Sequence, residues 1–297
     1  MVGPGATTVN AGAILAIPGT ASKRLARSVT NNGTLNWAGT INEDSGAHLV
    51  NNATITLTGS STTGNPTLID ATGTIVFTNN GTLTAAVGPA PGGGGGYPQA
   101  ELDGYTGPGT LTITQGQLRL RPVAGSTASV LPAGTVSSGA TLDLEPTSGS
   151  AATAGSFILP AGRTLTGTGT LLIGPNLRLT LVGTDTVNNL ENNGALDLGT
   201  TKVAIAGTYT QTSGASLMIA YTAGPSPANG SITTTSNTTL AGALRISGTP
   251  PPTNTVLAVN NVTIGSSPQA TLSGTYSSTP GGYTATYNAT SMTLTKS

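Results

Sequence analysis

The stretch SVTNNGTLNWAGT, residues 28–40, decides the fold, because the chain returns to its pattern of two asparagines, a small residue and a short alternating strand. The related stretches are LVNNATITLTGS (49–60), FTNNGTLTAAVG (77–88) and LENNGALDLGTT (190–201). Asn tolerates the left-handed backbone region and Gly enters it freely, so each pair predicts a corner between two strands. The predicted corner residues are Asn31, Asn32, Asn51, Asn52, Asn79, Asn80, Asn192 and Asn193.

The spacing of these corners predicts a solenoid. The first three pairs begin at positions 31, 51 and 79, and sequence repeats with periods of about 20–50 residues are typical of coils that bury their inner face by stacking. We therefore expect a parallel β-helix in which corner asparagines hydrogen-bond along the coil axis. The alternative is that Asn-Gly forms hairpin turns, which would give a sandwich or a barrel. Hairpin strands recur every ~8–12 residues, so the longer spacing favours the solenoid.

Composition supports an all-β chain and restricts its partners. Only 7% of the 297 residues are charged and the net charge is zero, so the chain has no overall electrostatic attraction to nucleic acid or to an anionic membrane. Thr, Val and Ile are abundant, and aromatic residues make up 3% of the chain, which indicates strands around a thin aliphatic core. There is no cysteine, which excludes disulfides, thiol nucleophiles and zinc–thiolate sites.

The sequence further predicts three regions and an extracellular location. Residues 1–27 read as an extended segment, 28–246 as the β-solenoid with a Gly-rich loop at 89–109, and 247–297 as a C-terminal β-sandwich-like cap. The five glycines at 92–96 are not followed by Gly-Lys-Ser/Thr, so we interpret them as a flexible excursion and not as a phosphate loop. The apolar AGAILAIP (11–18) precedes the nearest basic residues, which is the wrong order for a signal peptide. No apolar run is long enough to span a membrane, and we expect the mature part of a secreted or surface-displayed protein.

Two charged strands predict ion pairs between neighbouring coils. QLRLRP (117–122) carries Arg119 and Arg121 on one face, and TLDLEP (141–146) carries Asp143 and Glu145 on one face. Both Arg-to-acid offsets are 24 residues. A coil of that length would place each carboxylate beside a guanidinium on the next rung, about 4.8 Å away.

Part of the chain resembles a known class of proteins. TNNGTLNWAGTINEDSGAHLVNNATITLTG (30–59) resembles repeats of large bacterial surface adhesins and autotransporter passengers with parallel β-helix domains. GTYTQTSGASLMIAY (207–221) and GTYSSTPGGYTATYNATSMTLT (274–295) resemble the closing segments of such passengers. The resemblance implies a secreted or surface fibre with a structural or adhesive role, a capped C-terminus and no catalytic residue to carry over.

The sequence offers few groups for catalysis or metal binding. His48, the single histidine, follows Glu43 and Asp44; it could form a weak metal site, but a solvated loop is the favoured interpretation. Some β-helices act on polysaccharides, and Asp143 and Glu145 would lie about 7 Å apart, within the range of inverting glycosidases. Acids and aromatic platforms are scarce, so we predict no enzyme activity, no cofactor and no metal.

Thr-x-Thr recurs at positions 54, 82, 110 and 164. Regular threonine rows on a flat solenoid face can order water against ice. The spacing in the sequence is irregular, and Thr also suits any uncharged strand surface, so ice binding is a minor alternative.

The ends of a solenoid expose unpaired backbone groups that template the addition of another chain. ATTVNAGAILAIPGTA (6–21) is extended and apolar, and it could complete a neighbour's sheet; the self-association residues are Ile14, Leu15 and Ile17. Alternatively, this strand covers its own first rung. We therefore expect a non-catalytic extracellular structural protein that forms a homo-oligomer or homopolymer, as a filament or surface-fibre subunit. The alternatives are an adhesin that binds host or glycan ligands through the 89–109 loop and, less favoured, a polysaccharide-acting enzyme.

Overall fold

The computed structural model describes residues 5–19, 22–43, 46–59, 66–70, 75–88, 99–146, 155–183, 186–187, 189–224, 227–263 and 270–297. Every regular element in these ranges is a β-strand, and most strands pair in parallel with strands one coil away. The chain is a parallel β-helix, as the sequence predicts. It divides into two units, residues 1–157 and 158–297. No helix that could cross a membrane occurs in the described ranges.

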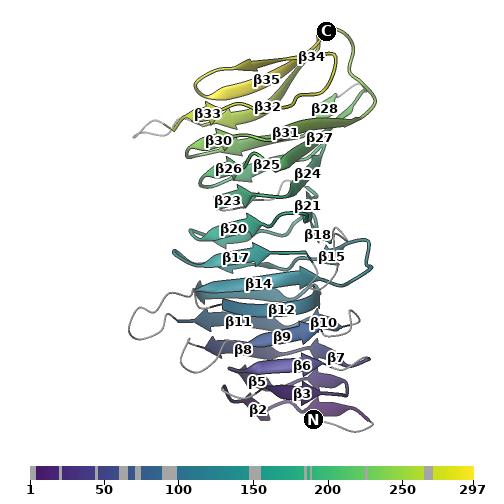
Figure 1. The fold of residues 1–297 in the computed structure, drawn as a ribbon, viewed down its shortest axis with the longest axis vertical. Helices are drawn as coiled ribbons and strands as arrows, with labels where there is room; N and C mark the ends of the chain where they lie inside the picture. Colours follow the sequence, from purple (N-terminus) through teal and green to yellow (C-terminus); the bar gives the residue numbers. More distant parts are fainter. Residues whose placement is uncertain are drawn as a thin grey trace. The chain divides into compact units, whose positions relative to one another are not determined.

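The N-terminal unit is built from coils of three strands, which Figure 1 shows as stacked rungs coloured from purple to teal. Its strands are β1 (Thr7–Val9), β2 (Ile14–Ile17), β3 (Lys23–Leu25), β4 (Val29–Asn31), β5 (Thr34–Trp37), β6 (Thr40–Glu43), β7 (His48–Asn51), β8 (Thr54–Gly59), β9 (Thr67–Asp70), β10 (Val76–Asn79), β11 (Thr82–Val87), β12 (Gln99–Thr106), β13 (Thr110–Gln115), β14 (Gln117–Pro122), β15 (Ser129–Val130), β16 (Ala133–Val136) and β17 (Thr141–Leu144).

Three series of parallel strands form the sides of this unit. One side runs β1-β4-β7-β10-β12-β14-β17, a second runs β2-β5-β8-β11-β13-β16, and a third runs β3-β6-β9 and joins the first at β12. β12 joins them because its first half pairs with β9 and its last residues pair with β10.

The C-terminal unit repeats the three-strand coil. The strand β18 (Ser156–Leu159) includes the boundary between the units. The other strands are β19 (Leu165–Gly167), β20 (Thr170–Ile173), β21 (Arg178–Leu181), β22 (Thr186–Val187), β23 (Asn189–Asn192), β24 (Ala195–Gly199), β25 (Lys202–Ile205), β26 (Tyr209–Gln211), β27 (Ser216–Thr222), β28 (Ala228–Asn229), β29 (Ser231–Thr234), β30 (Thr238–Leu240), β31 (Ala243–Gly248), β32 (Val256–Val262), β33 (Leu272–Gly274), β34 (Tyr283–Tyr287) and β35 (Ser291–Lys296). Its parallel series are β20-β23-β26-β30-β33, β21-β24-β27-β31 and β22-β25-β29-β32.

The core of each coil follows from strict alternation along the strands. In β11, Leu83, Ala85 and Val87 are fully buried while the residues between them are partly exposed. In-register stacking places Leu35, Ile55, Leu83 and Leu111 in one buried row, so apolar side chains meet like side chains on the next rung. Some of the few aromatic residues lie in this core, where Phe77 packs edge-on against Tyr105 with the ring centroids 5.5 Å apart.

The corner asparagines of the N-terminal unit form two hydrogen-bonded ladders. Asn31, Asn51 and Asn79 each end a strand and are completely buried, and their side chains form one column. Nδ2 of Asn31 donates to Oδ1 of Asn51, and Nδ2 of Asn51 donates to Oδ1 of Asn79, both at 2.8 Å. Asn32, Asn52 and Asn80 form a parallel exposed column, with side-chain bonds of 2.9 and 3.0 Å. The first column ends where Asn79 Nδ2 donates to the Tyr105 hydroxyl, 3.2 Å away.

The fourth Asn-Asn pair marks a corner of the C-terminal unit. Asn192 ends β23 and is completely buried, and its Nδ2 donates to the Ser216 carbonyl at 3.0 Å. Asn193 follows it, and its Nδ2 donates to Glu191 Oε1 at 3.1 Å. On the next coil the position of Asn192 is taken by Gln211, whose Oε1 lies 3.5 Å from Asn192 Nδ2. A longer amide side chain thus continues the stacking of polar corners.

The physical reason for the corners differs from the sequence-based argument. Among the described residues, the non-glycine residues with positive φ are Asn176 and Asn254, so no corner asparagine adopts the left-handed region. Gly33 and Gly81 do not adopt it either, but a Cβ on Gly81 would lie 2.1 Å from the Ala53 carbonyl oxygen of the previous coil. Glycine is needed there because the coils approach closely, and asparagine is needed for the ladder.

Two of the predicted regions differ from the structure, and a third stays a prediction. Residues 7–25 are not a separate extended segment, because β1, β2 and β3 pair with β4, β5 and β6 and form the first coil. Residues 99–106 of the expected 89–109 loop form β12, which begins with the alternating residues QAEL, and residues 89–98 lie outside the described residues. In residues 247–297, β32, β35 and β34 pair antiparallel and extend one sheet. The β-sandwich-like cap expected there stays a prediction.

Candidate functional site

One edge of the first coil has no partner strand among the described residues. Within the described residues, β1, β2 and β3 each pair with one strand of the second coil and with no other strand. Backbone hydrogen bonds fix which groups of β2 face outward. Thr34 N–H donates to Ala13 C=O and Ala38 N–H donates to Ile17 C=O, so by alternation the backbone groups of Ile14 and Ala16 point to the open side.

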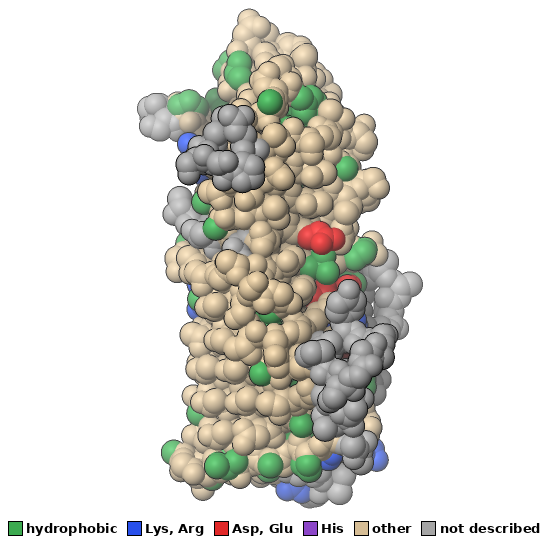
Figure 2. Space-filling view, turned by 90° about the vertical axis from the view of Figure 1, so that its left-hand side faces the viewer, with side chains coloured by type: hydrophobic (Ala, Val, Ile, Leu, Met, Phe, Trp, Pro, Cys, Tyr) green, Lys and Arg blue, Asp and Glu red, His purple; other side chains and the backbone are tan. Residues whose placement is uncertain are grey.

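An apolar hollow of about 280 Å³ lies beside this edge. Leu15 and Ile17 of β2 line it together with Leu25 of β3, and core residues of the next coils form its floor. Lys23 and Arg24 line the same hollow. Figure 2 shows hydrophobic and basic side chains along the lowest, N-terminal tier of the face in view. The edge therefore combines unpaired backbone groups with accessible apolar surface.

The three residues predicted to drive self-association have different positions in this edge. The Ile14 side chain is 70% exposed, Leu15 is half-buried, and Ile17 is buried. β2 pairs with β5 of the next coil, and no described strand pairs with its other edge. Self-association through this strand stays a prediction. Ile14 is thus the exposed apolar side chain of the group, while Leu15 and Ile17 shape the hollow.

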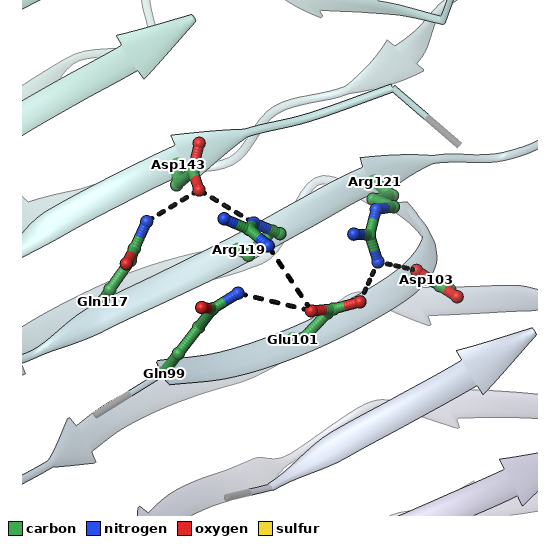
Figure 3. Close-up of polar contacts among 7 residues, drawn as sticks. All are labelled: Gln99, Glu101, Asp103, Gln117, Arg119, Arg121 and Asp143. Atoms are coloured by element: carbon green, nitrogen blue, oxygen red, sulfur yellow. Dashed lines mark hydrogen bonds and ion pairs between the residues drawn. The ribbon is translucent and has the colours of Figure 1, made fainter. Parts of the chain in front are cut away.

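A second candidate is a charged network on β12, β14 and β17 (Figure 3). Arg119 and Asp143 are opposite one another in the register of β14 and β17, and Arg119 Nε lies 2.8 Å from Asp143 Oδ2. Gln117 Nε2 also donates to Asp143 Oδ2, at 2.7 Å. On its other side, Arg119 forms an ion pair of 3.7 Å with Glu101 of β12.

The ion-pair partners of Arg121 differ from the one that the sequence predicts. It forms ion pairs with Glu101 and with Asp103, whose Oδ1 is 3.0 Å from Arg121 Nη1, while the expected partner Glu145 interacts with it only at longer range. The cause is an irregularity in β12. The register of β12 against β14 shifts between Leu102 and Tyr105, where one extra residue is accommodated. This bulge brings the Asp103 carboxylate to Arg121.

Burial and charge in this network shift two pKa values. Burial lowers the pKa of Arg121, and the negative charges of Glu145 and Asp143 oppose this shift. Burial, followed by repulsion from Asp143, raises the pKa of Glu145. The Asp143 side chain is 1% exposed and its Oδ1 has no hydrogen-bond partner. The network therefore holds buried charge between successive coils, with carboxylates and guanidiniums neutralising one another.

Sequence reasoning missed Glu101, Asp103 and Gln99, because it assigned residues 99–109 to a loop. The signal that could have found them is the alternation of QAELD, with Ala100 and Leu102 inward and polar residues outward. It is the same pattern as in QLRLR, which predicts a strand.

The residues considered for a metal site, His48 with Glu43 and Asp44, do not form a site among the described residues. His48 is exposed at the start of β7, Glu43 ends β6, and Asp44 lies outside the described residues. In the part of the chain that the structure describes, no group of three or more His, Asp or Glu side chains could hold a metal ion. Comparison with protein-family models, curated proteins and solved structures finds no match to this chain.

Proposed function

We propose that this chain is a non-catalytic extracellular structural protein that assembles through its N-terminal edge into a filament or surface fibre. The observation that carries the proposal is the open first coil: outward backbone groups at Ile14 and Ala16 next to an apolar hollow lined by Leu15 and Ile17. An unprotected parallel edge is a template for another strand.

The composition of the edge supports the proposal. Natural proteins block open edges with Pro, bulges or inward charges, and β2 pairs with β5 without a bulge and has none of these within ILAI. Its first residue, Ile14, is 70% exposed. A head-to-tail contact that does not close on itself produces an open chain of subunits.

The test uses a proline that affects only the open side. Ala16→Pro removes an N–H that faces away from β5, so the strand pairing within the subunit remains. Ile14→Lys adds charge at the same edge. The matched control is Ile69→Lys on β9, another large exposed apolar side chain, 38% exposed, in the middle of the stack.

We expect wild type and Ile69→Lys to form regular filaments in negative-stain electron microscopy at high concentration, and the two edge variants to remain short rods. Circular dichroism should show the same β-signal for all four proteins. Filaments of unchanged length from Ala16→Pro and Ile14→Lys would contradict the proposal, as would a monomeric wild type in sedimentation velocity at every concentration.

A further inference from the structure

A threonine array covers the outward face of the series β5-β8-β11-β13-β16 in the N-terminal unit. The first column is formed by residues that are paired in register on four successive strands: Thr34, Thr54, Thr82 and Thr110. The second column, two residues further along each strand, is Asn36, Thr56, Thr84, Thr112 and Thr135. We call these two columns the threonine face.

The face is regular although its sequence spacing is not. Thr34, Thr54 and Thr82 are paired rung to rung although their positions in the sequence are 20 and 28 residues apart. The Thr110 hydroxyl donates to the Thr82 hydroxyl, 3.2 Å away. The threonines are therefore regularly arranged in the structure although they are irregularly spaced in the sequence, because the additional residues lie outside this sheet.

The geometry of the sheet sets a two-dimensional lattice of hydroxyl and methyl groups. Neighbouring strands lie about 4.8 Å apart, and alternate residues on one strand are about 6.6 Å apart. Each threonine is flanked by buried core residues such as Leu83 or Leu111, which hold the strands in place, and β-branching restricts its side-chain rotamers. All members of the face are partly or fully exposed, and none is charged.

The chemistry of this face excludes the usual partners of a protein surface. Interfaces between proteins depend on Trp, Tyr and Arg anchors, and threonine is under-represented among them. The face has no such anchor and no aromatic platform for a sugar ring. A strongly hydrated ammonium or carboxylate would impose its own water geometry, and the face has neither. Over the lower coils of the face in view, Figure 2 shows mainly backbone and side chains that are neither hydrophobic nor charged, arranged in tiers.

We propose that the threonine face binds ice, the rigid lattice of water molecules, through its repeated hydroxyl and methyl groups. A single threonine hydroxyl gains little by exchanging one water for another. Many hydroxyls held at fixed spacing engage a periodic surface together, which multiplies weak contacts without further ordering cost. This inference does not depend on the proposed self-association, because the face lies along the side of the coils and not at their N-terminal edge.

The test replaces two central threonines by tyrosine, whose large side chain would protrude from the threonine face. Thr56→Tyr/Thr84→Tyr alters the threonine face at two successive rungs. The matched control is Thr30→Tyr/Thr78→Tyr, two outward, half-buried positions on β4 and β10 that belong to a different side of the coil. Thr112→Lys, a single substitution in the same second column, serves if the double variant does not fold. Circular dichroism melting establishes the fold of each protein.

The readouts are thermal hysteresis in a nanolitre osmometer and inhibition of ice recrystallisation. We expect wild type and the Thr30/Thr78 variant to arrest crystal growth and to shape the crystals, and the Thr56/Thr84 variant or Thr112→Lys to be at least tenfold less active. Wild type that behaves as an inert protein of the same mass would overturn the proposal. So would equal losses in the array and control variants, or retention on crystalline polysaccharide without an effect on ice.

Discussion

Nδ2 of Asn51 donates a hydrogen bond of 2.8 Å to Oδ1 of Asn79, a residue 28 positions later and one coil further along the stack. Both side chains are completely buried. Asn51 Oδ1 in turn accepts from Asn31 at 2.8 Å and from the Ala53 N–H at 3.3 Å. Three successive coils are thus tied together by buried polar side chains, in a core that has few aromatic residues.

Asn51→Ala should destabilise the protein by about 3 kcal/mol, because it removes the partner of one Asn31 amide N–H and of the Asn79 side-chain carbonyl in a buried site. Urea unfolding followed by circular dichroism measures the loss. Asn52→Ala is the control in the exposed column, where water replaces the lost bonds, and it should cost below about 1 kcal/mol. Equal losses for the two variants would show that the buried ladder has no special role.

Gly104→Ala should disrupt the bulge that positions Asp103. Gly104 has φ of +66°, and a Cβ there would lie 2.3 Å from the Ile75 carbonyl oxygen. We expect a loss of about 3 kcal/mol or more in the same urea experiment. Gly125→Ala separates the two causes, since Gly125 has φ of +70° but no atom near its Cβ position, and it should lose only about 1 kcal/mol. A similar loss at both positions would mean that the close approach to Ile75 relaxes freely.

Arg119→Met should leave the buried Asp143 carboxylate without its guanidinium and destabilise the protein by about 3 kcal/mol at pH 7. Arg119→Met/Asp143→Leu should recover most of the loss, because the unpaired charge is then gone. In the C-terminal unit, Arg178 pairs with Asp197 at a site where the arginine side chain is 46% exposed. Arg178→Met should therefore cost below about 1 kcal/mol. A double variant as unstable as Arg119→Met would argue against uncompensated charge as the cause.

Glu145→Gln should stabilise the protein at pH 7 and have no effect at pH 3. Burial and Asp143 raise the pKa of Glu145 in the folded state, so its favourable contribution is present below the pKa of the unfolded chain. That contribution is lost as the pH rises through the folded pKa. Glutamine imitates the protonated form of glutamate at every pH. The variant should therefore be more stable than wild type above the ordinary glutamate pKa of about 4.3 and equally stable below it. Melting temperatures of the variant and of wild type at both pH values test this prediction. A variant that is less stable than wild type at pH 7 would contradict it.

Much of the fold could be predicted from local patterns. Alternating Leu, Val and Ile with Thr predicts strands with one buried face, and the Asn-Asn pairs mark the ends of β4, β7, β10 and β23. Both signals depend on neighbours within a few residues. The Arg119–Asp143 contact was accessible as well, because a coil of 24 residues without a bulge preserves the offset. The Arg121 partners were not accessible, because the 18-residue offset between β12 and β14 and the bulge at Asp103 leave no periodic signal.

By itself, the sequence determined the class of the fold, because alternation, β-branching and the recurring corners are local properties that any stacked coil must satisfy. Only the tertiary structure decided which rung lies on which. Rung pairing depends on how much chain each loop takes up, and a shift by one residue would turn every side chain to the opposite face. That register aligns the threonines of unequally spaced segments into columns.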